Sequence, residues 1–208
     1  MIIGFDASRA FVAEPTGTER YSYELLKALL KIDRKNFYRI YINPYRINSK
    51  LETRNSKQYQ NTNNQNSKRL ENLIFEHLDL FRISDFGFRN FDVRPIYWPR
   101  LWTQGGLALE CLKNPPDVLF IPAHTLPIVH RPNQKTVVTI HDLGAEYLPE
   151  YHQFPHKYYI NWSTVYAVKH ATRIIAVSES TKKDLIVKLN CDSKKISVIY
   201  EAANDMNI

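Results

Sequence analysis

Residues 117–142 read DVLFIPAHTLPIVHRPNQKTVVTIHD. This stretch contains two short apolar runs, Asp117–Ile121 and Lys135–Ile140; Pro122 follows the first run, and His141-Asp142 follows the second. Apolar runs that do not alternate with polar residues are typical of parallel strands buried on both faces of a sheet. The stretch therefore predicts two strands of an α/β domain, each followed by residues capable of polar chemistry.

Comparable runs recur along the chain and alternate with segments of helical spacing. Further strands are expected at Ile2–Phe5, Tyr38–Ile42, Leu73–Leu80, Arg173–Val177 and Ile196–Ile199, and helices at Gly17–Ile32, Trp102–Leu112, Pro155–His170 and Ser178–Leu189. This alternation predicts a Rossmann-like, doubly wound parallel sheet with helices on both faces. In that architecture ligands bind at the carboxyl ends of the strands.

Two of the expected helices carry residues that recur along one face. These residues are Tyr21, Leu25, Leu29 and Ile32 in the first helix, and Tyr158, Trp162, Val165, Tyr166 and Lys169 along Pro155–His170. Such spacing is typical of helices that cover a sheet. At the start of the last helix, Thr181-x-x-Asp184 resembles a capping box.

The composition fits one globular domain of generous size. The chain has 208 residues, of which 44% are hydrophobic and 24% are charged, and this apolar fraction excludes a disordered protein. It contains no run of about 18 apolar residues that could form a transmembrane helix, and its N-terminus lacks the basic region of a signal peptide. Cys111 and Cys191 lack metal-ligand spacing, which favours a cytoplasmic protein with reduced, structural thiols.

The net charge of +7 is concentrated in one segment. Residues 45–70 contain six basic residues and one acidic residue, and so carry +5 of it. Within them, residues 55–66 read NSKQYQNTNNQN and have no aliphatic side chain to bury, which predicts a solvated insert. The insert is either a surface loop without a function or a contact with an anionic membrane surface. Nucleic acid is not expected as a partner, because no recognition helix or RNA-binding motif is present.

Residues 81–102 combine aromatic and basic side chains. The aromatic residues are Phe81, Phe86, Phe88, Phe91, Tyr97, Trp98 and Trp102, and the basic residues are Arg82, Arg89, Arg94 and Arg100. This mixture is found where bases stack on a protein or where a protein meets a membrane interface. The alternative is that the aromatic side chains belong to the core and that the arginines form its rim.

Polar residues with chemical potential follow several of the expected strands. In the loop Asp6–Thr18, Gly17 stands at a helix N-terminus, where N–H groups and the helix dipole favour a phosphate. Neither G-x-G-x-x-G nor G-x-x-x-x-G-K-[ST] is present, which argues against a dinucleotide oxidoreductase and a P-loop NTPase.

The pair His141-Asp142 follows another strand and could hydrogen-bond a polar ligand or move a proton, although it could equally be a loop-capping pair. His124 follows the preceding strand, and the two histidines lack a third ligand for zinc. Ser178 and Glu179 stand at a strand-to-helix junction, where helix capping is their first expected role.

In order and spacing, these motifs resemble those of the family 4 retaining glycosyltransferases. The resemblance rests on residues 15–21 (PTGTERY), 117–124, 139–143 (TIHDL), 174–185 (IIAVSESTKKDL) and 195–199 (KISVI), and it covers nearly the whole chain except 45–96. It implies a GT-B fold, in which two Rossmann-like domains enclose a cleft, with this chain as the N-terminal, acceptor-side domain.

The resemblance also implies a reaction and a set of site residues. The reaction is transfer of a sugar from a nucleotide-sugar to a hydroxyl of a saccharide or lipid-linked acceptor, with retention and without a cofactor or metal, in cell-envelope polysaccharide or glycolipid synthesis. Thr16, Gly17 and Thr18 would approach the donor pyrophosphate, and His141 would lie at the reaction centre. The residues expected at the acceptor cleft are Arg9, His124, Asp142, Ser178 and Glu179.

The sequence departs from the family pattern in three places. Thr16 stands where the family often has a first glycine, and residues 200–204 (YEAAN) stand where it usually has an Asn-Gly turn. No glutamate is followed by another eight positions later, so the E-x7-E pair of the donor-binding domain is missing. We therefore expect one domain over residues 1–200 and a truncated linker over 201–208.

A chain of this kind would need a donor-binding domain or subunit as its partner and would be inactive without it. The alternative is a non-catalytic Rossmann-like module that binds a partner subunit or an anionic membrane. Either protein would be cytoplasmic, and the basic insert would allow peripheral contact with the inner face of the membrane.

Overall fold

The computed structural model describes residues 1–12, 15–46, 90–143 and 156–202. Apart from its first two residues, the expected insert at 45–70 lies outside these ranges, as do the expected strand at 73–80 and the aromatic and basic residues of 81–89. The chain forms two compact units. The first comprises Met1–Phe120 and Val129–Gln134, and the second comprises Ile121–Ile128 and the chain from Lys135 onward.

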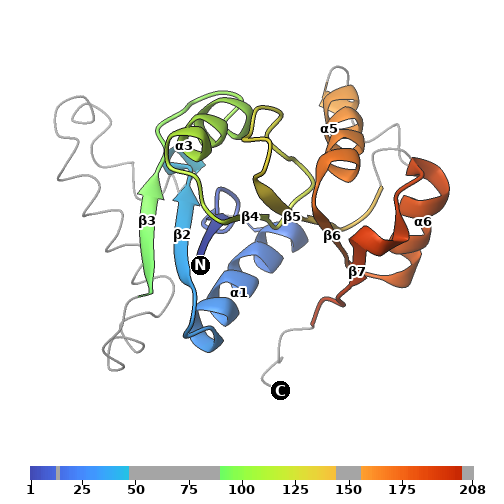
Figure 1. Ribbon diagram of the computed structural model, residues 1–208, viewed down its shortest axis with the longest axis horizontal. Coiled ribbons are helices and arrows are strands. Elements are labelled where there is room, and N and C mark those ends of the chain that lie inside the picture. The colour runs from blue at the N-terminus through green and yellow to red at the C-terminus, as the bar shows by residue number, and fades with distance from the viewer. Residues whose placement is uncertain (13–14, 47–89, 144–155, 203–208) are drawn as a thin grey trace. The chain divides into compact units, whose positions relative to one another are not determined.

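The first unit alternates strands and helices, as the sequence predicts (Figure 1). Its elements are β1 (Ile2–Asp6), α1 (Gly17–Ile32), β2 (Phe37–Ile42), η1 (Pro44–Arg46), β3 (Phe91–Pro95), η4 (Thr103–Leu107), α3 (Ala108–Lys113) and β4 (Val118–Ile121), of which the last residue belongs to the second unit. The strands lie in the order β3-β2-β1-β4, and every pairing among them is parallel.

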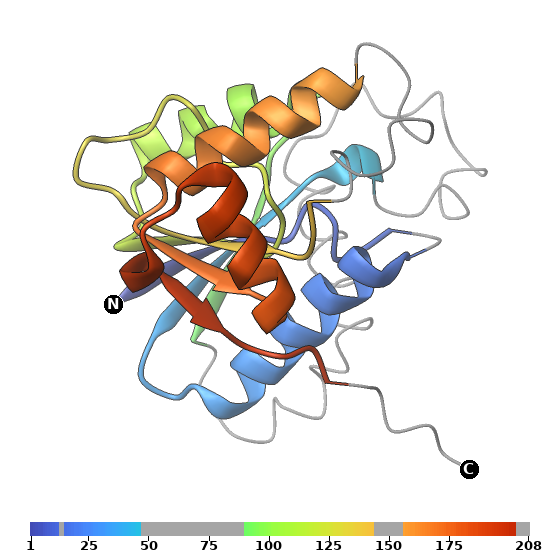
Figure 2. The ribbon, with the colours of Figure 1, turned by 90° about the vertical axis from the view of Figure 1, so that its right-hand side faces the viewer.

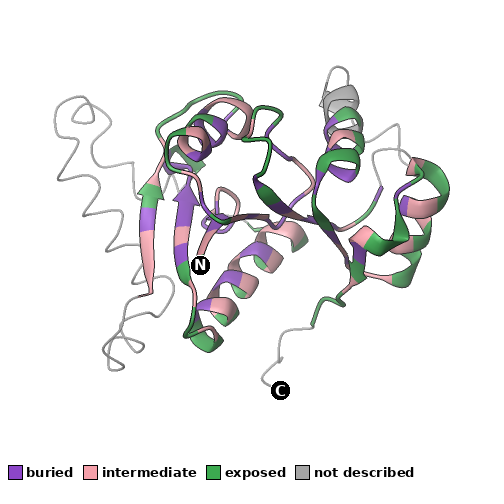
Figure 3. Cartoon of the chain, in the orientation of Figure 1, coloured by how far each residue is buried: buried purple, intermediate pink, exposed green. Residues whose placement is uncertain are grey.

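Helices cover both faces of these strands. On one face, Leu26 and Leu30 of α1 join the same buried cluster as Phe5 and Ile40. On the other face, the fully buried Tyr41 of β2 lies beside Cys111 of α3. Successive residues of a strand point to opposite faces, so the continuous apolar run of β2 supplies both layers. Figure 3 shows the resulting band of buried residues along β2 and the alternation of buried and exposed residues along α1.

The buried face of α1 is rotated from the one that the sequence predicts. Ser22, Leu26 and Leu30 are the buried residues of the helix, whereas Leu25 and Leu29 are only partly buried. Ile32, expected on the same face, is 71% exposed because the helix ends there and Asp33 caps it. The small side chain of Ser22 lets the helix approach the core at a position that the apolar spacing does not reveal.

The segment after residue 90 contains a strand that the sequence analysis did not anticipate. β3 pairs with β2 along its whole length, and Val93 is buried while Phe91 packs against the same core. Arg94 in this strand is exposed and binds Asp92 at 2.6 Å. The edge strand is not recognisable from the sequence, because its polar residues interrupt the apolar run that marks the other strands.

The helix expected at Trp102–Leu112 begins irregularly. Residues Thr103–Leu107 form a π-helical turn, and regular α-helix follows from Ala108 to Lys113. A Cβ atom placed on Gly105 would lie 2.5 Å from the ring of Trp98, and one on Gly106 would lie 2.8 Å from the Cβ of Trp98. Because neither glycine has a side chain, Trp98 can pack directly against the backbone of this turn.

The second unit has the same alternating plan (Figure 2). Its elements are β5 (Lys135–Ile140), α5 (His156–His170), β6 (Arg173–Ala176), α6 (Glu179–Leu189), η5 (Ser193–Lys195) and β7 (Ile196–Val198). β5 pairs with β6, and β6 pairs with β7, in both cases in parallel. Parallel strands connected by helices in both units confirm the prediction of a Rossmann-like α/β fold.

The predicted face of α5 points to solvent rather than to the sheet. Trp162 and Val165 are exposed, whereas Ala167 and Val168 are buried. The ring of Tyr166 stacks on that of Trp162, and its hydroxyl donates to the carbonyl of Ile128 at 2.9 Å. Trp162 and Tyr166 therefore lie toward the surface, which spacing alone does not distinguish from a core face.

Both cysteines fit the structural role that the sequence predicts. Cys111 and Cys191 are unpaired and buried. Burial raises the pKa of the Cys111 thiol to about 12, so this side chain stays protonated at neutral pH. Among the described residues, no helix is long and apolar enough to cross a membrane.

Gly4 provides a test of the packing in the first unit. A Cβ atom at this position would lie 2.7 Å from Cε2 of the buried Tyr41 and 2.8 Å from Cγ of Pro116. We predict that Gly4→Ala lowers the free energy of unfolding by about 1–3 kcal/mol, since overpacking forces both neighbours to shift. Urea denaturation measures this change.

The matched control is Gly17→Ala, because no described atom lies within 4 Å of a Cβ placed there. Equal stabilities of the two variants would contradict the packing described for β1 and β2.

Candidate functional site

The first group of predicted site residues lies where β1 meets α1. β1 ends at Asp6, whose carboxylate accepts a hydrogen bond from the backbone N–H of Ser8 at 3.0 Å. Burial raises the pKa of Asp6, although the amide of Ser8 and the charge of Arg9 act in the opposite direction. Asp6 thus shapes the turn that carries Arg9 toward the start of α1.

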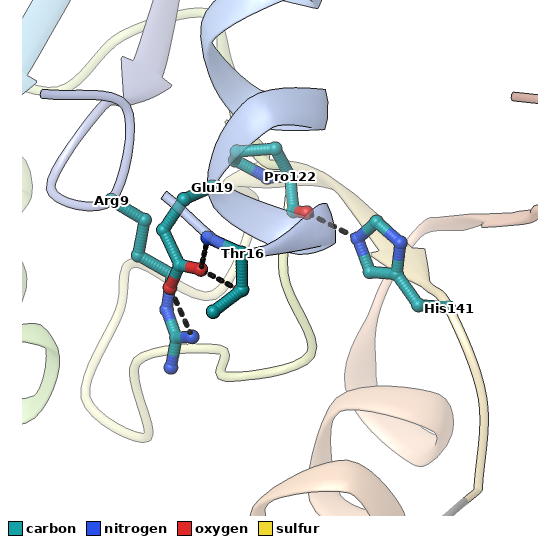
Figure 4. Close-up of polar contacts among 5 residues, drawn as sticks. All are labelled: Arg9, Thr16, Glu19, Pro122 and His141. Carbon is teal, nitrogen blue, oxygen red and sulfur yellow. Dashed lines mark hydrogen bonds and ion pairs between the residues drawn. The ribbon is translucent and has the colours of Figure 1, made fainter. Parts of the chain in front are cut away.

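Glu19 connects the predicted residues of this loop. Its carboxylate accepts hydrogen bonds from the backbone N–H of Thr16 at 3.2 Å and from the Thr16 hydroxyl, and it pairs with Arg9 at 3.4 Å (Figure 4). Burial alone would raise the pKa of Glu19, but the hydrogen bonds from Thr16 and the charge of Arg9 lower it overall. Glu19 is therefore an anion that already occupies part of the helix N-terminus.

Gly17 and Thr18 are the first two residues of α1. The first N–H groups of an α-helix have no partner inside the helix, so these two amides are the ones that geometry offers to an anion. No described atom lies within 4 Å of a Cβ placed on Gly17. Glycine is therefore not required here by packing, and the phosphate contact of Gly17 stays a prediction.

The second group of predicted site residues lies in the second unit, around His141. The histidine follows β5, and its ring is held through both nitrogens. Nδ1 lies 2.6 Å from a carboxylate oxygen of Glu201, and Nε2 lies 2.9 Å from the carbonyl oxygen of Pro122, a contact drawn in Figure 4. The side chain is only 13% exposed, so these contacts determine the direction of the ring.

Ser178 and His141 are brought together through Thr181. The Ser178 hydroxyl accepts a hydrogen bond from the backbone N–H of Thr181 at 3.0 Å and so caps α6. The Thr181 hydroxyl donates to the backbone carbonyl of His141 at 3.1 Å. This confirms the expected capping role of Ser178, whereas the capping box expected at Thr181 and Asp184 is wrong, because Asp184 pairs with Lys188 instead.

The other predicted site residues of this unit are neighbours in sequence of the residues that make these contacts. Asp142 directly follows His141 and is exposed, and Glu179 is the exposed first residue of α6. His124 is partly buried and lies two residues after Pro122. Arg9, predicted for the same acceptor cleft, belongs to the first unit and contacts Glu19 there.

Three residues that shape this site are not predicted from the sequence: Pro122, Thr181 and Glu201. The sequence identifies Pro122 only as the end of a strand and Thr181 only as a capping residue. Glu201 lies 60 positions from His141, so no local pattern links the two. Its sequence signal is its place three residues after the end of β7, since carboxyl ends of parallel strands meet at one edge.

An aromatic and basic surface in the first unit is a separate feature. The exposed apolar residues are Tyr45, Tyr97, Trp98 and Leu101, and the exposed arginines are Arg46, Arg94 and Arg100. The rings of Tyr45 and Tyr97 pack edge to face at 6.4 Å. We call these seven residues the aromatic–arginine surface. Trp102, in contrast, is buried, so core and surface aromatics both occur in this segment.

Comparison with known proteins identifies the family. The sequence signature of Glycosyltransferase Family 4 matches residues 15–205. The chain belongs to this family, as its motifs predict.

The proteins similar to the chain include a mannosyltransferase and a glycosyltransferase of known structure. The O-antigen chain mannosyltransferase RfbU of Salmonella typhimurium is 35% identical over 81 residues, which are 39% of this chain and 21% of that protein. The crystal structure of a glycosyltransferase from Rickettsia africae matches with a TM-score of 0.45 at 13% identity, over 98% of this chain and 43% of that one. The chain thus spans less than half of either protein.

In the described ranges, no three His, Cys, Asp or Glu side chains gather closely enough to hold a metal ion.

The cap on α6 is testable by substitution. We predict that Ser178→Ala lowers the free energy of unfolding by about 1 kcal/mol, because the N–H of Thr181 loses its acceptor. Thermal unfolding would show a melting temperature lower by about 2–4 °C.

Ser180→Ala is the control, since Ser180 is exposed in the first turn of the same helix. Ser178→Asp should retain the cap and the stability. An unchanged melting temperature for Ser178→Ala would contradict the capping role.

Proposed function

We propose that this chain is the acceptor-side domain of a retaining glycosyltransferase that transfers a sugar from a nucleotide-sugar to an acceptor hydroxyl. The observation that carries the proposal is the family match over residues 15–205, which contains the open start of α1 and the partly buried His141. The similarity to a protein named as an O-antigen mannosyltransferase supports a hexose donor and a cell-envelope saccharide or lipid-linked acceptor.

The proposed reaction needs stabilisation of charge more than a strong base. When a nucleotide-sugar donor reacts with retention through front-face attack, negative charge develops on the leaving diphosphate and positive charge on the sugar. The N–H groups of Gly17 and Thr18 would face the diphosphate, since helix N-termini favour anions. His141 would hydrogen-bond the reacting sugar or the acceptor hydroxyl. No metal or cofactor is part of the proposal.

The proposal also assigns the donor-binding residues to another part of the enzyme. The 208 residues contain no pair of glutamates spaced E-x7-E. At the start of α1, Arg9 is already paired with Glu19, so the loop offers a diphosphate little net positive charge. We therefore expect a donor-binding domain or subunit as partner, and a cytoplasmic location beside the nucleotide-sugar pool.

Sugar transfer tests the proposed function. The chain alone, incubated with radiolabelled nucleotide-sugars and a lipid-linked saccharide, should give no transfer above the blank. Addition of a family 4 donor-binding domain that carries the E-x7-E pair should produce transfer. His141→Ala should then lower kcat/KM by about 100-fold or more, and Gly17→Ala by about tenfold, because each removes or blocks a contact made in the transition state.

His170→Ala is the matched control for the histidine, since His170 lies at the exposed end of α5. Robust transfer by the chain alone would contradict the need for a donor-binding partner. Equal activities of His141→Ala and His170→Ala would contradict the role of His141.

The aromatic–arginine surface favours a second candidate function, binding to an anionic membrane. Trp98 is 40% exposed although it is the kind of side chain that usually seeks burial, and Arg100 lies two residues away. Tryptophan and tyrosine favour the membrane interface, and arginine favours anionic headgroups. Such a surface would bring either an acceptor-side domain or a non-catalytic module to a lipid-linked partner.

Vesicle binding tests this second function. The chain should co-sediment with phosphatidylglycerol vesicles at low salt and dissociate at high salt, because the attraction to anionic lipid is screened. Trp98→Ala and deletion of residues 45–70 should each weaken binding by about fivefold or more.

The control is Trp162→Ala, which removes an exposed tryptophan outside the aromatic–arginine surface. Binding that is unaffected by salt, or that falls equally in Trp162→Ala, would count against the proposed surface.

A further inference from the structure

Both ring nitrogens of His141 are engaged by oxygen atoms of the second unit itself. Nδ1 lies 2.6 Å from Oε1 of Glu201, and Nε2 lies 2.9 Å from the carbonyl oxygen of Pro122. These partners come from opposite sides of the histidine in sequence, one 19 residues before it and the other 60 residues after it. The side chain is only 13% exposed, so these two oxygen atoms are its principal polar surroundings.

The two partners together occupy the hydrogen-bonding capacity of the ring. A backbone carbonyl only accepts hydrogen bonds, so Nε2–H donates to the carbonyl of Pro122. Nδ1 is engaged by the carboxyl group of Glu201. In this arrangement neither ring nitrogen is available to a sugar hydroxyl.

The two partners differ in how firmly the protein holds them. Pro122 is buried and directly follows β4, so its carbonyl is fixed by the sheet. The Glu201 side chain is 42% exposed and lies on a segment that leaves β7, where Tyr200 and Ala202 are exposed as well. Within the described residues, the segment is bound to the sheet by the hydrogen bond from Ile199 N–H to the carbonyl of Ala176 at 3.0 Å. Glu201 is therefore the partner that can leave.

We propose that Glu201 is a positioning residue that acts as a displaceable latch on His141. In the latched state described here, Glu201 occupies Nδ1. When Glu201 swings away, Nε2–H stays on the carbonyl of Pro122 and Nδ1 becomes available to another polar group. The consequence for sugar transfer rests on the function proposed above, whereas the latch itself does not depend on it.

The position of the segment that follows β7 determines whether Nδ1 of His141 can bind a ligand. A ligand hydroxyl that reaches Nδ1 must compete with a carboxylate, so a weakly bound ligand leaves the ring occupied. Any movement of residues 200–202 away from the ends of the strands releases the same nitrogen. Glu201 thus links the position of this segment to the hydrogen-bonding capacity of the ring.

Chemical modification of the histidine tests the latch without any substrate. Diethyl pyrocarbonate reacts with an unprotonated, accessible ring nitrogen, and mass spectrometry of the resulting peptides gives the rate for each histidine. At pH 6.5, His141 should react at least fivefold more slowly than the exposed His170 in the unmodified chain. Glu201→Ala should raise the His141 rate by at least fivefold and leave the His170 rate unchanged.

Asp184→Ala is the matched control, because it removes a partly exposed carboxylate of the same unit that pairs with Lys188 rather than with a histidine. It should leave the His141 rate unchanged. A His141 rate that equals that of His170 in the unmodified chain, or that Glu201→Ala does not change, would overturn the latch.

A second measurement on the unmodified chain guards against misfolding of the variant. In ¹⁵N spectra of the histidine rings at the same pH, Nε2 of His141 should resonate in the protonated range. An unprotonated Nε2 would overturn the proposal, because the ring could then not donate to the carbonyl of Pro122. Neither readout requires sugar transfer, so failure of the proposed function and failure of the latch are distinguishable.

Discussion

The parallel register of β5, β6 and β7 is the constraint on which the His141 site depends. Ile140 pairs with Ala176, and Ala176 pairs with Val198, so all three strands end at one level. The residues that follow are consequently neighbours in space although they are far apart in sequence. A shift of one residue in either pairing would turn the shifted strand's side chains to the opposite face and separate the histidine from Glu201.

A common chemical feature links the two groups of site residues. In each group a carboxylate of the chain occupies donors that a ligand would need. Glu19 accepts from Thr16 and pairs with Arg9, and the carboxyl group of Glu201 lies 2.6 Å from Nδ1 of His141. The polar groups are therefore satisfied without a ligand, which agrees with the general rule that buried donors and acceptors are paired. A sugar or phosphate that binds at either place must exchange one hydrogen-bonded partner for another.

The sequence predicts the alternation of strands and helices well because buried parallel strands appear as uninterrupted apolar runs. The runs at 135–140 and 173–177 match β5 and β6 to within one residue. Edge strand β3 escapes prediction, since its polar face breaks the run. The buried face of α1 is also not predicted correctly. Its residue Ser22 fits against the core because it is small, and apolar spacing does not reveal this.

The site residues are predictable only in part for a related reason. Gly17, Ser178 and His141 stand next to elements that the sequence reveals, so their local settings follow from strand ends and helix starts. The contact of His141 with Glu201 depends on the pairing of three strands over 60 residues, and no short motif encodes that. To predict hydrogen-bond partners on distant strands, one must know the register of the strands. Composition and spacing do not determine that register.

The packing of Trp98 against Gly105 and Gly106 has a consequence for conformational entropy. A side chain on either glycine would collide with the tryptophan. The ring is therefore confined by its own chain while part of it stays in water. A side chain ordered before any encounter loses few rotamers when a partner covers it. Burial of the exposed part of Trp98 would thus retain most of its hydrophobic free energy instead of losing it to the cost of immobilising a flexible side chain.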